Sequence, residues 1–224
     1  EAVKDVVFVA RCDQSIAVAL LSACWHHGIR CIEWNFFVEA TYRKLNVYDE
    51  HLDWLMHLDQ QYAHPSYSKI KRALDIAAAG SGIIISAPIL LFGMVATFLE
   101  SGRPVFFKQP RVGSKGEVFT AWKLRTMILD QGNDASKWSS EGDSRITKVG
   151  AFMRRTRVDE IPQLFNVLGG SMSLVGPRPE WTEIAEEWME EIPFYEYRTM
   201  VKPGLTGWAQ VNFPYAATKE EVLE

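Results

Sequence analysis

The chain has 224 residues, of which 47% are hydrophobic and 23% are charged, and its formal net charge is −4. This balance is ordinary for a folded protein and excludes disorder along the whole chain. The charge is uneven, because Arg145 to Arg157 holds five basic residues and no acid, whereas Glu180 to Glu191 holds six glutamates and no base. A solvated surface explains most such runs, but a basic stretch beside carboxylates also fits a site for phosphate-bearing ligands.

The first third of the chain begins with the pattern of a βαβ unit. Residues 5–10 are typical of a buried strand, Ser15 to His27 predicts a helix that Gly28 ends, and Ile29 to Ile32 predicts a second strand. No Gly-x-Gly-x-x-Gly turn follows the first strand, which argues against dinucleotide binding. We interpret the unit as a fragment of a Rossmann-like region.

A connector follows the βαβ unit. Residues 33–66 contain amphipathic helical pieces, among them Tyr48 to Leu58. The first predicted segment is therefore 1–66, the Rossmann-like remnant with its connector.

The second predicted segment, 67–100, has the composition of a membrane helix. Ile76 to Leu99 carries no charged side chain, and its 24 residues exceed the roughly 20 that span a bilayer. Pro88, in the middle, removes a backbone donor and is expected to break or kink the helix. Basic residues flank both ends (Lys69, Lys71 and Arg72 before; Arg103 and Lys108 after), so both ends favour the cytoplasmic side. A re-entrant helix satisfies both flanks, while a kinked full span and a buried helix of a soluble domain stay open.

The third predicted segment, 101–224, is typical of a compact, helix-rich α/β domain with short strands. Strands are expected at Val105 to Lys108 and Val118 to Lys123. The expected helices are Thr126 to Gly132, Lys148 to Thr156, Glu160 to Leu168 and Glu180 to Met189.

The strongest chemical signal is the adjacent pair Asp159 and Glu160. Pro162 is tolerated only in the first turn of a helix, so a helix is expected to begin at about Asp159 or Glu160. Asp159 would then lie among unpaired backbone N–H groups, which keep a carboxylate ionised and also attract phosphate. A plain N-cap is the structural alternative. Two adjacent carboxylates are more than a cap needs, because one can attack phosphorus while the other holds a metal ion or moves protons.

A carboxylate that attacks a diphosphate must overcome the repulsion between two anions, so cations are needed nearby. Glu160 is a candidate ligand for Mg²⁺, which takes one or two carboxylates together with substrate phosphates. Arg178 lies in the rigid tripeptide Pro177-Arg178-Pro179, where flanking prolines restrict the backbone, although a structural turn is an equal alternative. The other candidate phosphate-binding residues are Arg111, Lys123, Arg125, Arg154, Arg155 and Arg157.

Several motifs in order resemble the bacterial sugar transferase family, the monotopic phosphoglycosyl transferases. They cover about residues 69–218 and are Lys71-Arg72-Ala-Leu-Asp75, Val105-Phe-Phe-Lys-Gln109-Pro-Arg111-Val-Gly113, Lys123-Leu-Arg125-Thr126-Met127, Asp159-Glu160-Ile-Pro162-Gln163, Val175-Gly-Pro-Arg178-Pro-Glu180 and Lys202-Pro-Gly-Leu-Thr-Gly-Trp-Ala-Gln210-Val-Asn. The N-terminal region looks like the one that precedes this domain in the larger, polytopic members. The chain ends at Glu224, where related chains continue with further helical sequence.

The resemblance implies a two-step reaction at the inner membrane, with the catalytic domain facing the cytoplasm. Asp159 would attack the β-phosphate of a UDP-sugar, release UMP and hold the sugar phosphate until polyprenyl (undecaprenyl) phosphate accepts it. It also implies Mg²⁺, a re-entrant helix at Pro88, and a role for Gln163 beside the carboxylate pair. The product would begin exopolysaccharide, capsule or O-antigen synthesis. No nucleic-acid partner is expected, and a homodimer through the N-terminal region is left open.

Two other functions compete with this one. A direct glycosyltransferase would use Asp159 or Glu160 as a base or metal ligand and release UDP instead of UMP. A catalytically silent membrane scaffold would have no use for an intact Asp-Glu pair among arginines.

Overall fold

The computed structural model describes residues 5–8, 14–33, 41, 65–128 and 143–212. The chain forms two compact units, Glu1–Pro65 and Ser66–Glu224. Helices and short strands are mixed along the described parts of the chain, as predicted. The predicted helix at Tyr48 to Leu58 lies outside the described residues.

The first unit contains the predicted βαβ arrangement. Strand β1 (Asp5–Phe8) pairs in parallel with β2 (Arg30–Glu33), and helix α1 (Gln14–His26) connects them. A parallel pair needs such a crossover, because a tight turn reverses the chain. Gly28, with a φ of 66°, follows the helix as expected, since glycine adopts the left-handed region without a steric penalty.

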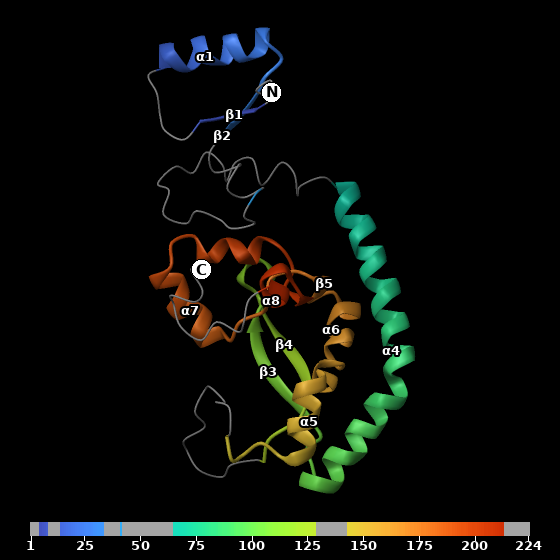
Figure 1. Cartoon of the computed structure of the whole chain (residues 1–224). Coiled ribbons are helices and arrows are strands. Elements are labelled where there is room, and N and C mark those ends of the chain that lie inside the picture. Colours follow the sequence, from blue (N-terminus) through green and yellow to red (C-terminus); the bar gives the residue numbers. More distant parts are fainter. Residues whose placement is uncertain (1–4, 9–13, 34–40, 42–64, 129–142, 213–224) are drawn as a thin grey trace. The chain divides into compact units, whose positions relative to one another are not determined.

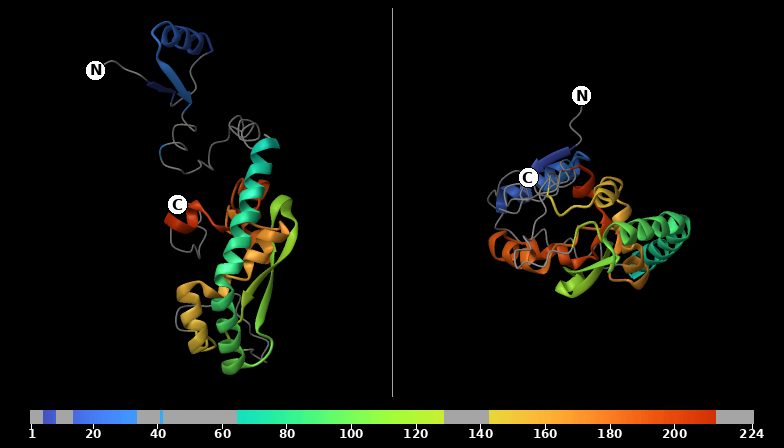
Figure 2. Two further views of the ribbon diagram at one scale, coloured as in Figure 1. Left: turned by 90° about the vertical axis from the view of Figure 1, so that its right-hand side faces the viewer. Right: turned by 90° about the horizontal axis from the view of Figure 1, so that it is seen from below.

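The second unit begins with one long helix, α4 (Pro65–Ser101), which lies along the rest of the unit in Figures 1 and 2. It continues through Pro88 and bends along its length instead of ending there (Figure 1). Among the described residues, α4 is the one helix that is long and apolar enough to cross a membrane. Only 11% of its most apolar stretch is buried. Exposed side chains such as Ile84, Ile85 and Phe92 contradict the alternative of a buried soluble helix.

Small residues let α4 approach the body of the unit. Ala79 is fully buried against Val167 and Met172, and a Cβ added to Gly82 would lie 3.3 Å from Leu164. At the far end, the Arg125 guanidinium donates to the carbonyl oxygens of Ser101 and Gly102 at 2.5 and 2.9 Å.

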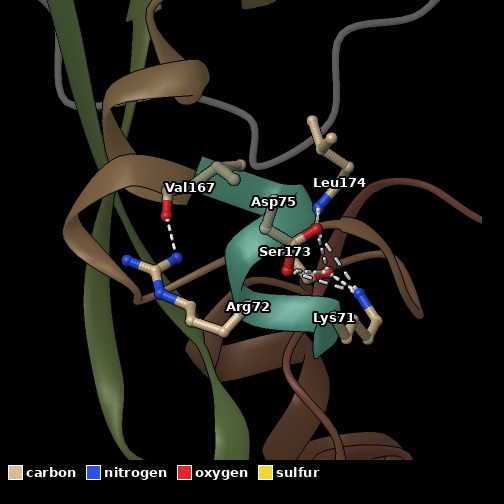
Figure 3. Close-up of polar contacts among 6 residues, drawn as sticks. All are labelled: Lys71, Arg72, Asp75, Val167, Ser173 and Leu174. Atoms are coloured by element: carbon tan, nitrogen blue, oxygen red, sulfur yellow. Dashed lines mark hydrogen bonds and ion pairs between the residues drawn. The ribbon is translucent and has the colours of Figure 1, made fainter. Parts of the chain in front are cut away.

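A buried polar junction anchors the beginning of α4 (Figure 3). The Asp75 carboxylate accepts hydrogen bonds from the Ser173 hydroxyl at 2.9 Å and from the Leu174 N–H at 3.1 Å, and Lys71 donates to Ser173 and to Asp75. Arg72 donates at 2.6 Å to the carbonyl oxygens of Val167 and Leu168, which lie in the last turn of α6 (Gln163–Gly169). The guanidinium therefore caps orphan carbonyl groups of a helix end.

The body of the second unit is built around an antiparallel hairpin. Strand β3 (Phe106–Val112) pairs with β4 (Val118–Leu124) in the register Phe106 to Leu124, and the turn η1 (Ser114–Gly116) joins them. Both strands are longer than the predicted ones. Helix α5 (Lys148–Thr156), the turn η2 (Val158–Glu160) and α6 then follow in sequence.

The C-terminal elements complete the body. Strand β5 (Ser173–Val175) pairs in parallel with β6 (Gly204–Thr206), and α8 (Trp208–Asn212) follows β6. Helix α7 (Thr182–Glu191) and the turn η3 (Tyr195–Met200) share a small apolar core that includes Ile184 and Trp188.

Two predicted helices need correction. The segment after β4 is extended, because Met127 forms a bridge with Ile146 and the Thr126 carbonyl accepts from the Thr147 N–H at 3.1 Å; residues 129–132 lie outside the described part. The helix expected to begin at Asp159 or Glu160 is divided into η2 and α6, which begins at Gln163. Pro162 still precedes the helix directly with a helical φ of −59°, as its ring permits.

Candidate active site

The Asp159-Glu160 pair lies on the short turn η2, between α5 and α6. Arg157, which ends α5, has a left-handed φ of 58°, and the turn that follows it packs against β4. Asp159 is 7% exposed, and its Oδ1 atom is buried without a hydrogen-bond partner. A buried carboxylate oxygen with no partner is costly to keep, so such an atom calls for an explanation in ligand binding or chemistry.

Burial raises the pKa of Asp159, and the negative charge of Glu160 adds to this effect. The nearby cations Lys123 and Arg154 act in the opposite direction without cancelling it. The pKa of Asp159 is thus shifted upward, not downward as an open helix start would shift it. The reason is that α6 begins four residues later, so desolvation is the largest effect on this carboxyl group.

The pKa of Glu160 is shifted in the opposite direction, downward. Burial opposes its ionisation, but the Lys123 ammonium group lies 2.7 Å from Oε1, and together with Arg178 and Arg157 it lowers the pKa of Glu160. Burial also lowers the pKa of Lys123, which Glu160 offsets only in part. The guanidinium of Arg157 lies 3.7 Å from Glu160 and is largely exposed.

The structure brings six predicted residues to one pocket. Lys123 projects from β4, Glu160 from η2 and Gln163 from the start of α6, while Arg111 comes from β3. The complete set of lining residues is Arg111, Ala121, Lys123, Glu160, Gln163, Arg178, Pro179, Gly204, Leu205 and Gln210. Three cations and one carboxylate thus meet at the same surface, an arrangement suited to an anionic ligand.

Arg111 also shapes the loop that carries Arg178. Its guanidinium donates to the Pro179 carbonyl oxygen at 2.7 Å and to Gln109 Oε1 at 2.6 Å, and it lies over the Trp181 ring at 5.5 Å. The Arg178 carbonyl oxygen accepts from Arg198 at 2.7 Å. Arginine side chains from two other parts of the chain thus hold the backbone carbonyl groups of the Pro177-Arg178-Pro179 tripeptide.

Asn166 sets the position of α6 relative to β4. Its side-chain amide accepts from the Trp122 N–H at 3.2 Å and donates to the Thr120 carbonyl oxygen at 2.7 Å. The amide therefore takes the place of a neighbouring strand on β4. The contact holds Gln163, on the first turn of α6, near Lys123.

The remaining predicted residues lie around the pocket or away from it. Pro177 lines an adjoining pocket that shares Arg178 with the first. Arg154 donates to the Thr126 hydroxyl at 2.8 Å, beside Asp159, and Arg155 is exposed. Arg125 is buried at the end of α4, where its hydrogen bonds join α4 to β4. Pro88 lies inside α4.

The sequence alone assigned no role to the part of the pocket wall that β6 and α8 form. Gly204, Leu205 and Gln210 lie more than 40 residues after Glu160 and reach the pocket only because β6 pairs with β5. A Cβ on Gly204 would collide with the Gly176 backbone, so glycine permits this close approach. The motif from Lys202 to Gln210 marked the segment without indicating its function.

Glu160 is the carboxylate of the pocket, and the neighbouring Asp159 has an unpartnered buried oxygen. Among the described residues, no group of three or more metal-binding side chains occurs. Mg²⁺ commonly takes one or two carboxylates and completes its shell with water and substrate phosphates. The donor set therefore fits a metal that arrives with a phosphate-bearing ligand.

Comparisons with known proteins identify the family. Residues 66–224 match the family described as bacterial sugar transferase. The chain is 45% identical over 157 residues to the UDP-N-acetylgalactosamine-undecaprenyl-phosphate N-acetylgalactosaminephosphotransferase of Aeromonas hydrophila, covering 70% of this chain and 37% of that protein. It is 43% identical over 143 residues to the UDP-glucose:undecaprenyl-phosphate glucose-1-phosphate transferase of Escherichia coli K12, covering 64% and 31%.

A protein of Caulobacter vibrioides with the same name as the Escherichia coli protein is 46% identical over 143 residues, covering 63% of this chain and 53% of that protein. The chain thus spans about a third of the length of the first two relatives and about half of the third. Since the family match covers more than half of the chain, the protein belongs to the bacterial sugar transferase family.

Proposed function

We propose that the protein transfers a sugar 1-phosphate from a UDP-sugar to undecaprenyl phosphate, as the first membrane step of exopolysaccharide, capsule or O-antigen synthesis. The observation that carries the proposal is the buried, unpartnered oxygen of Asp159, next to Glu160, which lines a pocket together with three cations. The names of the relatives support the donor and acceptor classes, because all three describe transfer to undecaprenyl phosphate from a UDP-sugar. They name different sugars at similar identity, so they leave the sugar open.

In the first step, a carboxylate oxygen of Asp159 attacks the β-phosphorus of the UDP-sugar. The bond from that phosphorus to the bridging oxygen breaks, and UMP leaves with the bonding electron pair. In the second step, a phosphate oxygen of the polyprenyl acceptor attacks the same phosphorus, and the Asp159 carboxylate leaves. Burial makes the carboxylate less well solvated, and therefore a better nucleophile once it is ionised.

The positive charges of the neighbouring cations reduce the electrostatic repulsion between the Asp159 carboxylate and the diphosphate. Lys123, Arg111 and Arg178 line the pocket and offer donors to phosphate oxygens, and Arg178 is aimed by its flanking prolines. Glu160 would hold Mg²⁺, which supplies further positive charge to the phosphates when it is bound.

The membrane part of the proposal rests on α4. Its exposed apolar length supports association with a bilayer, and basic residues flank it at both ends. We propose that the helix enters and leaves on the cytoplasmic side of the inner membrane, bending in the region of Pro88.

The test is a trapping experiment. The purified chain is incubated with a UDP-sugar and Mg²⁺ in the absence of acceptor, and we expect one equivalent of UMP and a sugar phosphate on Asp159, detected by mass spectrometry. Asp159→Asn should abolish UMP release, whereas Glu186→Gln, on the exposed face of α7, should retain it. Release of UDP without an adduct would instead establish the direct glycosyltransferase, and an unchanged polysaccharide output in cells carrying Asp159→Ala would favour the scaffold.

A further inference from the structure

We propose that Gln210 recognises a neutral hydrogen-bond donor of the nucleotide sugar, a hydroxyl or an N–H group, and so contributes to donor specificity. This inference rests on the proposed donor and adds a residue with no assigned role. Gln210 lies on α8 and lines the pocket together with Lys123, Glu160 and Arg178. Its Oε1 atom is buried and has no hydrogen-bond partner.

The unpaired oxygen specifies the chemistry of its partner. A carbonyl oxygen only accepts hydrogen bonds, so a phosphate oxygen at neutral pH cannot satisfy it. The pocket cations are suited to the phosphates, which leaves Gln210 to meet a part of the ligand that donates. In a UDP-sugar, the groups that do so are the hydroxyls of the sugar and ribose, the imide N–H of the uracil ring and, in an N-acetylated sugar, the amide N–H. A site built to pair such a group discriminates against ligands that lack it, because its own polar atom is then left unpaired.

The backbone holds Gln210 in position. The N–H of Gly176 donates to the Thr206 carbonyl oxygen at 2.9 Å. The Val211 N–H donates to the Gly207 carbonyl oxygen at 3.1 Å, and this second bond ties α8 to the end of β6. A Cβ on Gly207 would lie 3.1 Å from Gln210 Oε1 and would also collide with the Gly176 backbone. Glycine at this position therefore leaves room for the amide beside the loop that carries Arg178.

The experiment measures donor binding without turnover. Full-length protein carrying Asp159→Asn, which keeps the donor intact, is titrated calorimetrically with a UDP-sugar and with UDP. Adding Gln210→Met, which matches the length of glutamine without its amide, is expected to raise the Kd for the UDP-sugar about ten- to hundredfold. The control Val211→Ala changes an exposed side chain of the same short helix and should leave the Kd within about twofold.

The two ligands distinguish the sources of the donor group. Equal losses for UDP and the UDP-sugar assign the group to the uridine, whereas a loss for the UDP-sugar alone assigns it to the sugar. An analogue that lacks the assigned group should bind the Gln210→Met variant and its parent equally, which a merely structural role of Gln210 would not produce.

Unchanged Kd values for both ligands in the Gln210→Met variant would overturn the inference, and so would a failure of the parent protein to bind either ligand. The nucleophile assignment fails independently. If Asp159→Asn still released UMP, the covalent step would be lost, but a Gln210-dependent Kd would stand.

Discussion

Asp159 combines burial with a missing partner, and this combination has a cost in stability. Because its pKa is raised in the folded protein, the folded state favours the protonated form, so this group stabilises the fold at low pH and that stability is lost as the pH rises through its folded pKa. Asp159→Asn stays neutral at every pH. We expect it to stabilise the protein at neutral pH while it abolishes UMP release.

Thermal unfolding at several pH values measures this effect. The difference in Tm between Asp159→Asn and the wild type should grow from acidic to neutral pH. The comparison variant is Asp143→Asn, at a carboxylate whose pKa Arg145 lowers to about 2, and this variant should not raise the Tm. A Tm for Asp159→Asn below that of the wild type at neutral pH would contradict the argument.

Lys123 tunes the ionisation of the same carboxylate. Its positive charge lowers the pKa of Asp159, so Lys123→Met should raise that pKa further and move the acidic limb of the pH profile of UMP release to higher pH. The measurement is kcat/KM for UMP release as a function of pH. Lys115→Met, in the exposed hairpin turn, serves as the control and should leave the limb unchanged. A limb that stayed in place or moved to lower pH in Lys123→Met would refute this electrostatic coupling.

Helix α4 is joined to the body by the Asp75 junction as well as by apolar contacts (Figure 3). Asp75→Ala leaves the Ser173 hydroxyl, the Leu174 N–H and the Lys71 ammonium group without their acceptor. We expect a loss of about 2–3 kcal/mol in the free energy of unfolding, measured by denaturant titration in detergent. The exposed Lys69→Ala should change it little, and an equally small effect of Asp75→Ala would show that the junction contributes nothing.

Pro88 is the second feature of α4 with a testable consequence. The helix continues through it and is bent along its length, and a proline inside a helix removes one backbone hydrogen bond. Pro88→Ala should restore that bond, straighten the helix and move its C-terminal end relative to the membrane. Cysteine labelling of that end from each side of the membrane measures the change, with Ala87→Ser as the control. Identical labelling in wild type and Pro88→Ala would contradict the re-entrant topology.

The second unit contains both apolar clusters, the pocket and the whole family match. We therefore expect a chain that begins at Ser66 to release UMP at a rate within about twofold of the full chain, since a compact unit with its own core can fold alone. The rate of UMP release per mole of folded protein is the measurement, and Asp159→Asn in the short chain is the blank. A short chain that unfolds at the same temperature but releases no UMP would assign residues 1–65 a direct role in activity.

Local pattern was sufficient for much of this protein. The βαβ order, the helix at Lys148–Thr156, the long apolar helix and the carboxylate pair all follow from periodicity, turn residues and charge, which act over a few neighbouring residues. Six of the predicted site residues line one pocket. Charge or a rigid proline marked five of them in the sequence, and the family resemblance marked Gln163.

Tertiary structure decided the rest. It divided the helix expected at Asp159, raised the pKa of that residue by burial, and made the described residues after Arg125, where a helix was expected, an extended segment paired to Ile146. It also brought Gln210 to the pocket through a parallel strand pair and placed Arg125 at the end of α4. Each outcome depends on partners distant in the chain, and desolvation and long-range pairing are properties of the packed molecule that no short stretch of sequence contains.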